Sequence, residues 1–386
     1  MGPRPPLACV AETTLLTPPP PDPANPSREL LLGALYGAFA ALILWPLPLQ
    51  MSAALALGTE ETGTVPMAMA FPFWWQADRL LVGFAGFWDA PIFAPTPHTF
   101  ALSETNTLGS LLLAPVVLLS GSAALGHNVF LWLSLALNGY VAHRLLRALR
   151  LSWPVAAIGG AVVVALPLPL QEIGVLPLVP VWGILWSYLA LLRWTELPTP
   201  RRGAGLGVAL AATYLLCFQY ALFLVLLLLL IAPILLRRSL LRPAALGSLL
   251  LGAVLCTTIV APIVRGQAET VSEPSFDRSR AKVEKLASKP RHYARTAFPQ
   301  LVPTPGIGVA PQPGWKAFWP GTTRVALAAA GLLWALSLAS YTRWGFFLAV
   351  GAMIAYAMSL GPFLRVGGFL PWELMGDVVP GYSKIR

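Results

Sequence analysis

Residues 128–149, NVFLWLSLALNGYVAHRLLRAL, form a long apolar run that ends in Arg144, Arg147 and Arg150. An apolar segment of about 20 residues is long enough to cross the hydrocarbon core of a bilayer as a helix. Lysine and arginine gather at the cytoplasmic ends of such helices. This segment therefore predicts a transmembrane helix whose C-terminal end faces the cytoplasm.

The composition of the whole chain indicates the same class of protein. Of 386 residues, 56% are hydrophobic and 11% are charged, and the mean hydropathy is +0.69. A soluble domain carries about a quarter charged residues. The expected fold is therefore all-α, a polytopic integral membrane protein. The net charge of +10 comes with no basic helix or aromatic RNA-binding motif, so no nucleic acid partner is expected. The three cysteines are isolated, which predicts neither a disulfide nor a metal site.

Eight further segments have the length and apolarity expected of membrane spans. They are Leu31–Leu49, Trp153–Leu170, Val179–Trp194, Gly205–Gln219, Ala221–Leu236, Ala244–Val264, Thr322–Ser340 and Gly345–Leu360. The apolar run Leu108–Gly121 is short for a crossing and is expected to dip into one leaflet. The sequence thus predicts about nine transmembrane helices.

The positions of the arginines support this count. With a cytoplasmic N-terminus and no crossing at 108–121, the inner ends and short inner loops hold Arg28, Arg144, Arg147, Arg150, Arg193, Arg201, Arg202, Arg237, Arg238, Arg242 and Arg343. The short outer connections near 171–179 and 219–220 then contain no lysine or arginine. A crossing at 108–121 would move most of these arginines outside, against the positive-inside rule.

The predicted organisation is one membrane domain with a short tail. Residues 1–28 are rich in proline and are expected to be a disordered cytoplasmic tail. Residues 29–386 form a single transmembrane domain with two large outer segments, loop 1 at about 50–127 with short interfacial helices and a second at about 265–321. Twelve of the sixteen acidic residues fall on the outer side in this arrangement. The polar chemistry is therefore expected to face outward.

Loop 1 contains the stretch 71–108, FPFWWQADRLLVGFAGFWDAPIFAPTPHTFALSETNTL, in which acids stand among tryptophans and phenylalanines. Asp89 follows Trp88 and precedes a proline turn, and it is the candidate catalytic base, since partial burial raises a carboxylate pKa; capping a turn is the alternative. Glu104 is expected either to contact substrate hydroxyls or to belong to a capping box for the following helix. Asp78 is a weaker substrate-binding candidate because it can pair with Arg79.

Two other outer segments contribute candidates. Glu172 lies in a proline-rich turn at the outer end of a span, and Gln219 and Tyr220 lie at the next outer turn; all three are candidate substrate contacts. The second large segment contains a basic run, RSRAKVEKLASKPRHYAR at 278–295. Arg291, His292 and Arg295 are the candidate phosphate ligands. The alternative for most of this run is a solvated face against anionic lipid headgroups.

Several stretches together resemble the bacterial multi-pass glycosyltransferases of the GT-C type. They are FWDAPIFAPTPHTFALSET, LGSLLLAPVVLLSGSAALGHNVFLWLSLALNGYVAHRLLRAL, FQYALFLVL, FWPGTTRVALAAAGLL, SLGPFL and VPGYSKIR. Asp89 and Glu104 match acidic positions of that pattern. The chain departs from it at Glu60 and Glu61, where relatives often have an aspartate, and at QEIGVLPL, where relatives often have a histidine-containing segment. Relatives also continue with further spans past the last of these stretches, which predicts that this chain is a fragment.

The resemblance implies a function in the bacterial inner membrane. A sugar would pass from a polyprenyl-phosphate donor to a glycan, lipid or protein acceptor at a site on the outer face, with no certain cofactor and with a divalent metal ion left open. No HExxH, GxSxG, P-loop or GxGxxG pattern is present, which argues against protease, hydrolase and nucleotide-driven chemistry. The alternatives are a lipid or solute transporter or flippase, and a non-catalytic membrane scaffold descended from a glycosyltransferase.

Overall fold

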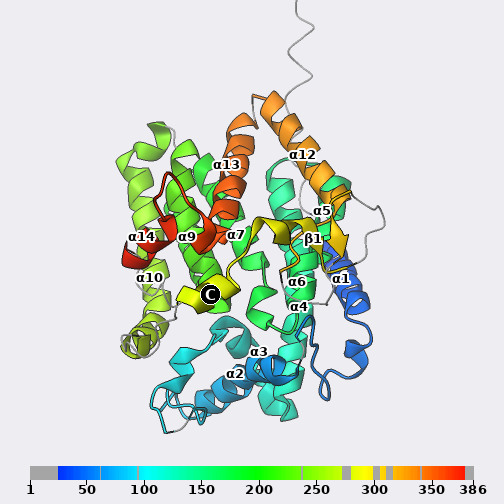
Figure 1. The fold of residues 1–386 in the computed structure, drawn as a ribbon, viewed down its shortest axis with the longest axis vertical. Coiled ribbons are helices and arrows are strands. Elements are labelled where there is room, and N and C mark those ends of the chain that lie inside the picture. Colours follow the sequence, from blue (N-terminus) through cyan, green and yellow to red (C-terminus); the bar gives the residue numbers. More distant parts are fainter. Residues whose placement is uncertain are drawn as a thin grey trace, which may run out of the picture.

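The computed structural model describes residues 25–60, 62–93, 95–235, 238–271, 280–298, 305–309, 316–339 and 341–378, almost all of them helical or in turns (Figure 1). The helices are α1 Pro26–Ile43, α2 Thr64–Leu81, α3 Thr107–Ser120, α4 Ala123–Ala148, α5 Trp153–Val164, α6 Pro167–Gln171, α7 Trp182–Glu196, α8 Pro200–Leu216, α9 Phe218–Ile231, α10 Pro243–Val271, α11 Arg280–Leu286, α12 Thr322–Ser337, α13 Thr342–Ser359 and α14 Pro371–Val378. Two short parallel strands, β1 Arg295–Thr296 and β2 Gly308–Val309, pair with each other.

Five helical segments are long and apolar enough to cross a membrane: Ala123–Ala148, Trp153–Gln171, Leu176–Glu196, Phe218–Leu235 and Pro243–Glu269. They confirm the expected all-α membrane class. A helix also lies in each of the other four ranges expected to span, as α1, α8, α12 and α13. The count of nine crossings itself stays a prediction.

The first helix begins earlier than expected. The Asn25 side chain accepts hydrogen bonds from the backbone N–H groups of Ser27 (3.1 Å) and Arg28 (3.4 Å), and Pro26 occupies the first turn. Asparagine at the N-cap with proline just after it is a strong helix start. Residues 26–28 are therefore helical and not part of the tail; residues 1–24 lie outside the described residues, as does the C-terminal VPGYSKIR stretch.

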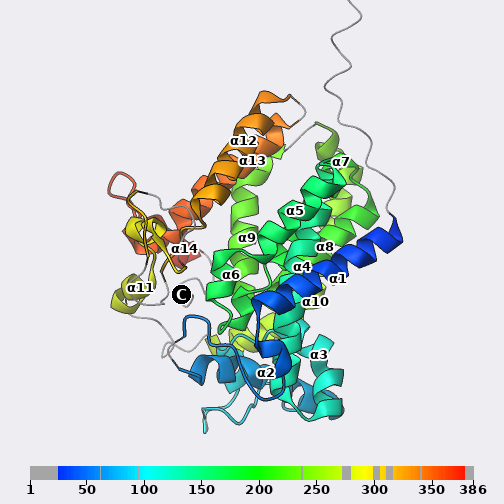
Figure 2. The ribbon, with the colours of Figure 1, turned by 90° about the vertical axis from the view of Figure 1, so that its right-hand side faces the viewer.

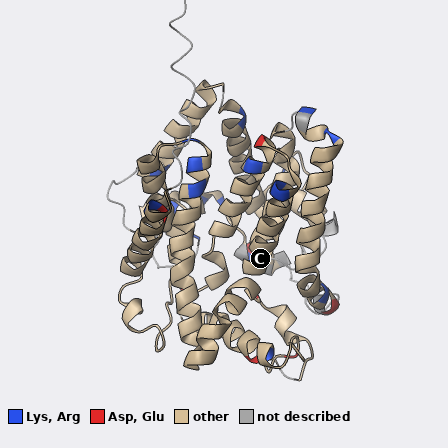
Figure 3. Ribbon diagram, turned by 180° about the vertical axis from the view of Figure 1, so that it is seen from behind, with Lys and Arg blue, Asp and Glu red and all other residues tan. Residues whose placement is uncertain are grey.

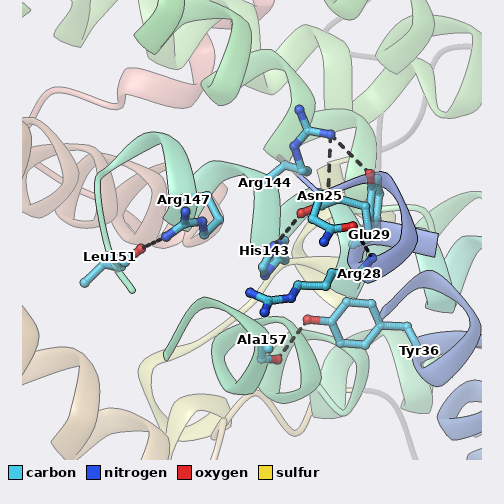
Figure 4. A network of polar contacts seen from close by, with 10 residues as sticks. Asn25, Arg28, Glu29, Tyr36, His143, Arg144, Arg147, Leu151 and Ala157 are labelled. Atoms are coloured by element: carbon cyan, nitrogen blue, oxygen red, sulfur yellow. Dashed lines mark hydrogen bonds and ion pairs between the residues drawn. The ribbon is translucent and has the colours of Figure 1, made fainter. Parts of the chain in front are cut away.

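Several helix ends that carry arginines gather at one end of the molecule, here called the arginine-rich end (Arg28, Arg144, Arg147, Arg150, Arg193, Arg201 and Arg202; Figure 3). Figure 4 shows how α1 is attached there: the Glu29 Oε1 atom lies 3.6 Å from Nε2 of the buried His143, and Glu29 Oε2 lies 4.0 Å from an Arg144 nitrogen. The Tyr341 hydroxyl donates to the Leu149 carbonyl (3.0 Å), which brings the α12–α13 turn to the same end.

The opposite end, here called the loop end, collects the connections at 44–63, 82–106, 120–122 and 171–181. The Asn128 side chain donates to the carbonyls of Met51 (2.8 Å) and Ala54 (2.6 Å), and the Thr59 N–H donates to the Gln171 carbonyl (3.0 Å). The α2 and α3 helices lie at this end in both views (Figures 1 and 2). Alternating connections therefore lie at alternating ends, as a bundle of up-and-down helices requires.

The α8–α10 contact is the tightest helix pairing in the bundle. A Cβ placed on Gly203 would lie 2.0 Å from the Ser248 carbonyl oxygen, and one on Gly207 would lie 2.0 Å from the Gly252 carbonyl oxygen. Small residues four apart on both helices let two backbones approach closely, which is how membrane helices pack. This seam joins the N-terminal halves of α8 and α10, which therefore run in the same direction.

Loop 1 is a folded layer and not a flexible connection. Its helix α2 packs against α3 and contributes the fully buried Phe73 to the main core. A separate aromatic cluster is built on Trp75 and Phe100, with Phe71, Phe87 and Trp88 packed around them. Helices are therefore present in loop 1, although α2, with 18 residues, is not short; their position at a membrane interface stays a prediction.

Asn138, fully buried in α4, makes two hydrogen bonds that connect α4 to α7. Its Nδ2 donates to the Val179 carbonyl (2.9 Å) and its Oδ1 accepts from the Trp182 N–H (2.8 Å). Replacing Asn138 by alanine leaves both backbone groups unpaired, and we expect the free energy of unfolding to fall by roughly 2 to 4 kcal/mol. Unfolding by SDS titration measures this, with the exposed Ser120→Ala as control; an unchanged midpoint for Asn138→Ala would contradict it.

Candidate functional site

Loop 1 is attached to the end of α10 by a tryptophan. Gly266 in α10 is packed so closely on Trp88 that a Cβ at this position would lie 2.0 Å from the indole ring. The backbone N–H of Phe100 donates to the Trp88 carbonyl (3.1 Å), and the Trp75 indole donates to the Phe87 carbonyl (2.8 Å). The residue that follows Trp88, Asp89, is thereby held at a fixed place beside α10.

Asp89 lies at the surface of the loop end in contact with a histidine. Its Oδ1 accepts a hydrogen bond from the backbone N–H of His98 (3.1 Å), and the His98 Nε2 atom lies 3.8 Å from the same oxygen. The other ring nitrogen of His98 lies 3.9 Å from a carboxylate oxygen of Glu269 in α10. The Asp89 side chain is 57% exposed. A carboxylate that is open to solvent and oriented by a loop can meet a substrate approaching from outside.

Glu104 lies deeper, at the junction between α8 and α9. These helices are separated by the single residue Cys217, and the backbone N–H of Phe218 at the start of α9 is directed at the Glu104 carboxylate. Burial raises the pKa of Glu104 to about 8, and the hydrogen bond from Phe218 opposes this only in part. A carboxyl group with this pKa is mostly protonated at pH 7 and can donate a hydrogen bond.

The capping box considered for Ser103–Asn106 is not formed. The N-cap of α3 is Asn106, in a left-handed conformation (φ 41°), and its side chain makes no capping hydrogen bond. The Glu104 side chain turns instead toward a different helix, α9. A sequence signature cannot distinguish these outcomes, since the α8–α9 junction is more than 100 residues away along the chain.

Three buried polar residues at or next to the start of α3, which follows Glu104 in the chain, were missed by the sequence reasoning: Gln76, Asn106 and Ser110. The Gln76 amide nitrogen donates to the Thr105 carbonyl (2.7 Å). Its Oε1, both polar atoms of the Asn106 amide, the Ser110 hydroxyl and Glu104 Oε1 are buried and lack a hydrogen-bond partner within the described part of the chain. Buried polar groups in folded proteins are normally paired. These atoms are the ones most able to bind water or a polar group of a ligand.

The C-terminal end of α10 also contacts the surroundings of Glu104. The Tyr214 hydroxyl in α8 donates to the Gln267 side-chain oxygen (2.7 Å), and Glu104 lies close enough to Tyr214 to act on it electrostatically. Gln267 and Glu269 are thus neighbours on one helix, the first directed at the surroundings of Glu104 and the second at His98 and Asp89. The structure therefore places the two leading acids on either side of the α10 end.

Glu172 belongs to a second polar group at the loop end. Burial raises the pKa of its carboxyl group, the Gln171 amide donates to its Oε1 (3.2 Å), and the nearby Glu60 raises the pKa further. The Tyr220 hydroxyl in the first turn of α9 donates to the Leu178 carbonyl (2.6 Å) and lies close to Glu172. Gln219 follows Phe218 in the same turn. These candidates surround the start of α9, next to Glu104.

Asp78 forms an ion pair with its neighbour Arg79. Arg79 donates from Nε to Asp78 Oδ2 (2.9 Å), its guanidinium lies over the Trp75 ring at 4.5 Å, and its other end donates to the Ala85 carbonyl (2.9 Å). The predicted ion pair is confirmed. Its evident role is to hold the turn after α2.

The basic segment lies on the opposite side of the molecule from α1, beside α14 (Figure 2). Arg291 is exposed and Arg295 is partly exposed, whereas His292 is 4% exposed and its Nδ1 accepts from the Lys289 N–H (2.9 Å). Burial and the surrounding Lys316, Arg291, Arg295 and Lys289 lower the pKa of His292 to about 4. A neutral imidazole supplies no positive charge, so only Arg291 and Arg295 of the three candidates can attract phosphate.

The candidate acids therefore fall into two groups: Asp89 with His98 and Glu269, and, around the start of α9, Glu104 and Glu172 with Tyr220. Within the described ranges, no three His, Cys, Asp or Glu side chains are arranged to hold a metal ion. Comparisons with protein-family models, curated proteins and solved structures find no match for this chain.

Proposed function

We propose that the protein is a membrane glycosyltransferase that acts at the loop end, with a lipid-linked sugar phosphate as donor. The observation that carries the proposal is Glu104, a carboxyl group of raised pKa beside unpaired buried polar atoms, at a helix start and within a membrane protein. Perturbed acids of this kind concentrate at functional sites. A buried acid that only stabilises the fold would be expected to have hydrogen-bond partners for its carboxyl oxygens.

The proposed roles follow from exposure and charge. Asp89 is accessible, and we assign to it the removal of the proton from the acceptor hydroxyl. Glu104 carries a proton at neutral pH and would donate a hydrogen bond to a sugar hydroxyl or a phosphate oxygen, with Glu172, Gln219 and Tyr220 nearby to orient hydroxyl groups. Arg291 and Arg295 would stabilise the negative charge on the departing phosphate. In this proposal the loop end faces outward and the arginine-rich end faces the cytoplasm.

Replacing Asp89 by asparagine tests the proposed base. We expect sugar transfer to fall by at least about 100-fold, the usual contribution of a positioned base, while unfolding in SDS stays unchanged. The assay follows consumption of radiolabelled polyprenyl-linked sugars by the purified protein in membranes. The matched control is Glu196→Gln, an acid at the arginine-rich end whose partner is Arg202 at 3.7 Å. Full activity of Asp89→Asn would refute the assignment.

One observation favours a second function. Glu104 is a buried acid beside the turn where α8 ends and α9 begins, and membrane transporters use acids within the bundle and helix ends to bind ions or substrates. A transporter would move its substrate across sealed vesicles without consuming a sugar donor. Transport that is abolished by Glu104→Gln, in a protein that consumes no donor, would favour this alternative.

A further inference from the structure

The segment that follows α10 is the most positively charged part of the chain. Between residues 280 and 316 there are seven lysines and arginines and a single acid, Glu284. A solvated membrane-proximal face can be basic without further meaning. What distinguishes this segment is that part of it is folded into a compact unit.

Hydrogen bonds hold the unit together around His292. The backbone N–H of Phe318 donates to the His292 carbonyl (3.0 Å), and that of Trp319 donates to the Arg295 carbonyl (2.9 Å). Arg295 also begins β1, which pairs with β2. On the other side, the Tyr293 hydroxyl lies 2.5 Å from the Ser359 hydroxyl in α13. Two stretches that are distant in sequence, 289–296 and 316–319, are thereby fixed side by side.

This arrangement brings the positive charges together. The Lys316 ammonium group donates to the Lys285 carbonyl, and Lys316 has a left-handed backbone (φ 76°), an uncommon conformation for a residue other than glycine. The Lys289 ammonium group lies 4.6 Å from the centre of the Phe363 ring. Burial, followed by the charges of Lys289, Arg291 and Lys285, lowers the pKa of Lys316. The cations around Lys316 therefore add to the cost of charging its ammonium group, a cost that a bound anion would relieve.

We propose that Lys289, Arg291, Arg295 and Lys316 form a diphosphate site, so that the donor is linked to its lipid through a diphosphate and not a monophosphate. A glycosyl monophosphate diester carries one negative charge, whereas the diphosphate carries two and offers more oxygen atoms to forked guanidinium groups. Four cations in one unit fit the second ligand better. The neutral, buried His292 acts as a spacer between the charged residues.

That the bound diphosphate belongs to a sugar donor rests on the proposed glycosyl transfer. That the four cations bind a diphosphate does not depend on that proposal. In the transfer step, the acceptor oxygen forms a bond to the anomeric carbon as the bond from that carbon to the diphosphate oxygen breaks. The bonding electrons leave with the lipid diphosphate, and the acceptor proton goes to Asp89. The site described here would bind the leaving group and stabilise its charge.

The test measures binding of inorganic pyrophosphate and orthophosphate to the full protein in phosphatidylcholine nanodiscs by calorimetry. We expect pyrophosphate to bind at least tenfold more tightly than orthophosphate, and Arg291→Gln and Lys316→Gln each to weaken it at least fivefold. The control is Arg201→Gln, an exposed arginine at the start of α8. Equal affinity for the two anions, or no effect of either variant, would overturn the proposal.

Two further experiments complete the test. The first distinguishes lipid headgroups from the lipid-linked donor as the source of the bound anion, and the second distinguishes diphosphate binding from sugar transfer. Nanodiscs containing phosphatidylglycerol distinguish a general headgroup surface: if this lipid abolishes pyrophosphate binding, the segment is a headgroup site and the inference is wrong. Asp89→Asn distinguishes transfer from binding, because it should lose transfer and keep pyrophosphate affinity. A protein that binds pyrophosphate selectively but consumes no lipid-linked sugar would refute the proposed function and leave the diphosphate site standing.

Discussion

Replacing Gly207 by alanine is expected to lower the free energy of unfolding by about 3 kcal/mol or more, which is large for the addition of one methyl group. The added Cβ would lie 2.0 Å from the Gly252 carbonyl oxygen and 2.6 Å from its carbon. Both are backbone atoms, so no side chain can rotate to make room. The two helices would have to separate, and the close contact along the Gly203–Gly207 face would be lost.

The chain contains a matched control two residues away. A Cβ on Gly205, on the same helix, would have no atom within 4 Å. Gly205→Ala should therefore leave stability unchanged or increase it by up to about 1 kcal/mol, the difference in helix propensity. SDS unfolding of both variants measures the contrast. Equal midpoints for the two variants would show that α8 and α10 do not pack as described.

Replacing Glu104 by glutamine is expected to change how stability depends on pH. Because the pKa of Glu104 is raised to about 8 in the folded protein, this state keeps its proton at pH values where the unfolded chain has lost it. The folded state is then favoured below about pH 4.5 and loses stability as the pH rises toward 8. The loss is at most about 1.4 kcal/mol per pH unit. The glutamine variant cannot ionise and should lack this contribution.

The measurement is the unfolding midpoint of the wild-type protein and of Glu104→Gln at several values between pH 5 and pH 8.5. The difference between the two proteins isolates Glu104 from the other titrating groups. We expect the variant to gain stability relative to wild type as the pH rises. Parallel curves would mean that Glu104 is ionised across this range and does not act as a hydrogen-bond donor at neutral pH.

The helical framework could largely be predicted from the sequence, because apolar length and arginine position depend on local composition. The short helix expected at 108–121 is α3 at Thr107–Ser120, for example, and the main differences are at helix ends. The expected span at 153–170 is divided at Pro167 into α5 and α6. Whether each helix crosses a membrane depends on the surrounding bilayer, and the count of nine remains a prediction.

The details of the site could not be predicted in the same way, because they depend on contacts between distant segments. Glu104 was a candidate by its position in an acidic loop, but its contact with the start of α9 follows from helix packing. Gln76 and Ser110 looked like ordinary polar residues in helices, and only their buried, unpaired side-chain oxygen atoms distinguish them. His292 was selected as a cation, yet its burial and the lysines and arginines around it keep it neutral.

The most direct test of the proposed function is sugar transfer in sealed right-side-out vesicles that contain the wild-type protein or Asp89→Asn. The donor is a radiolabelled polyprenyl-linked sugar, and an added glycosidase that cannot cross the membrane reports which face carries the product. We expect a labelled product that this enzyme removes, formed by the wild-type protein and absent with Asp89→Asn. Product formed at the wild-type rate by Asp89→Asn, product protected inside the vesicles, or no consumption of any donor would contradict it.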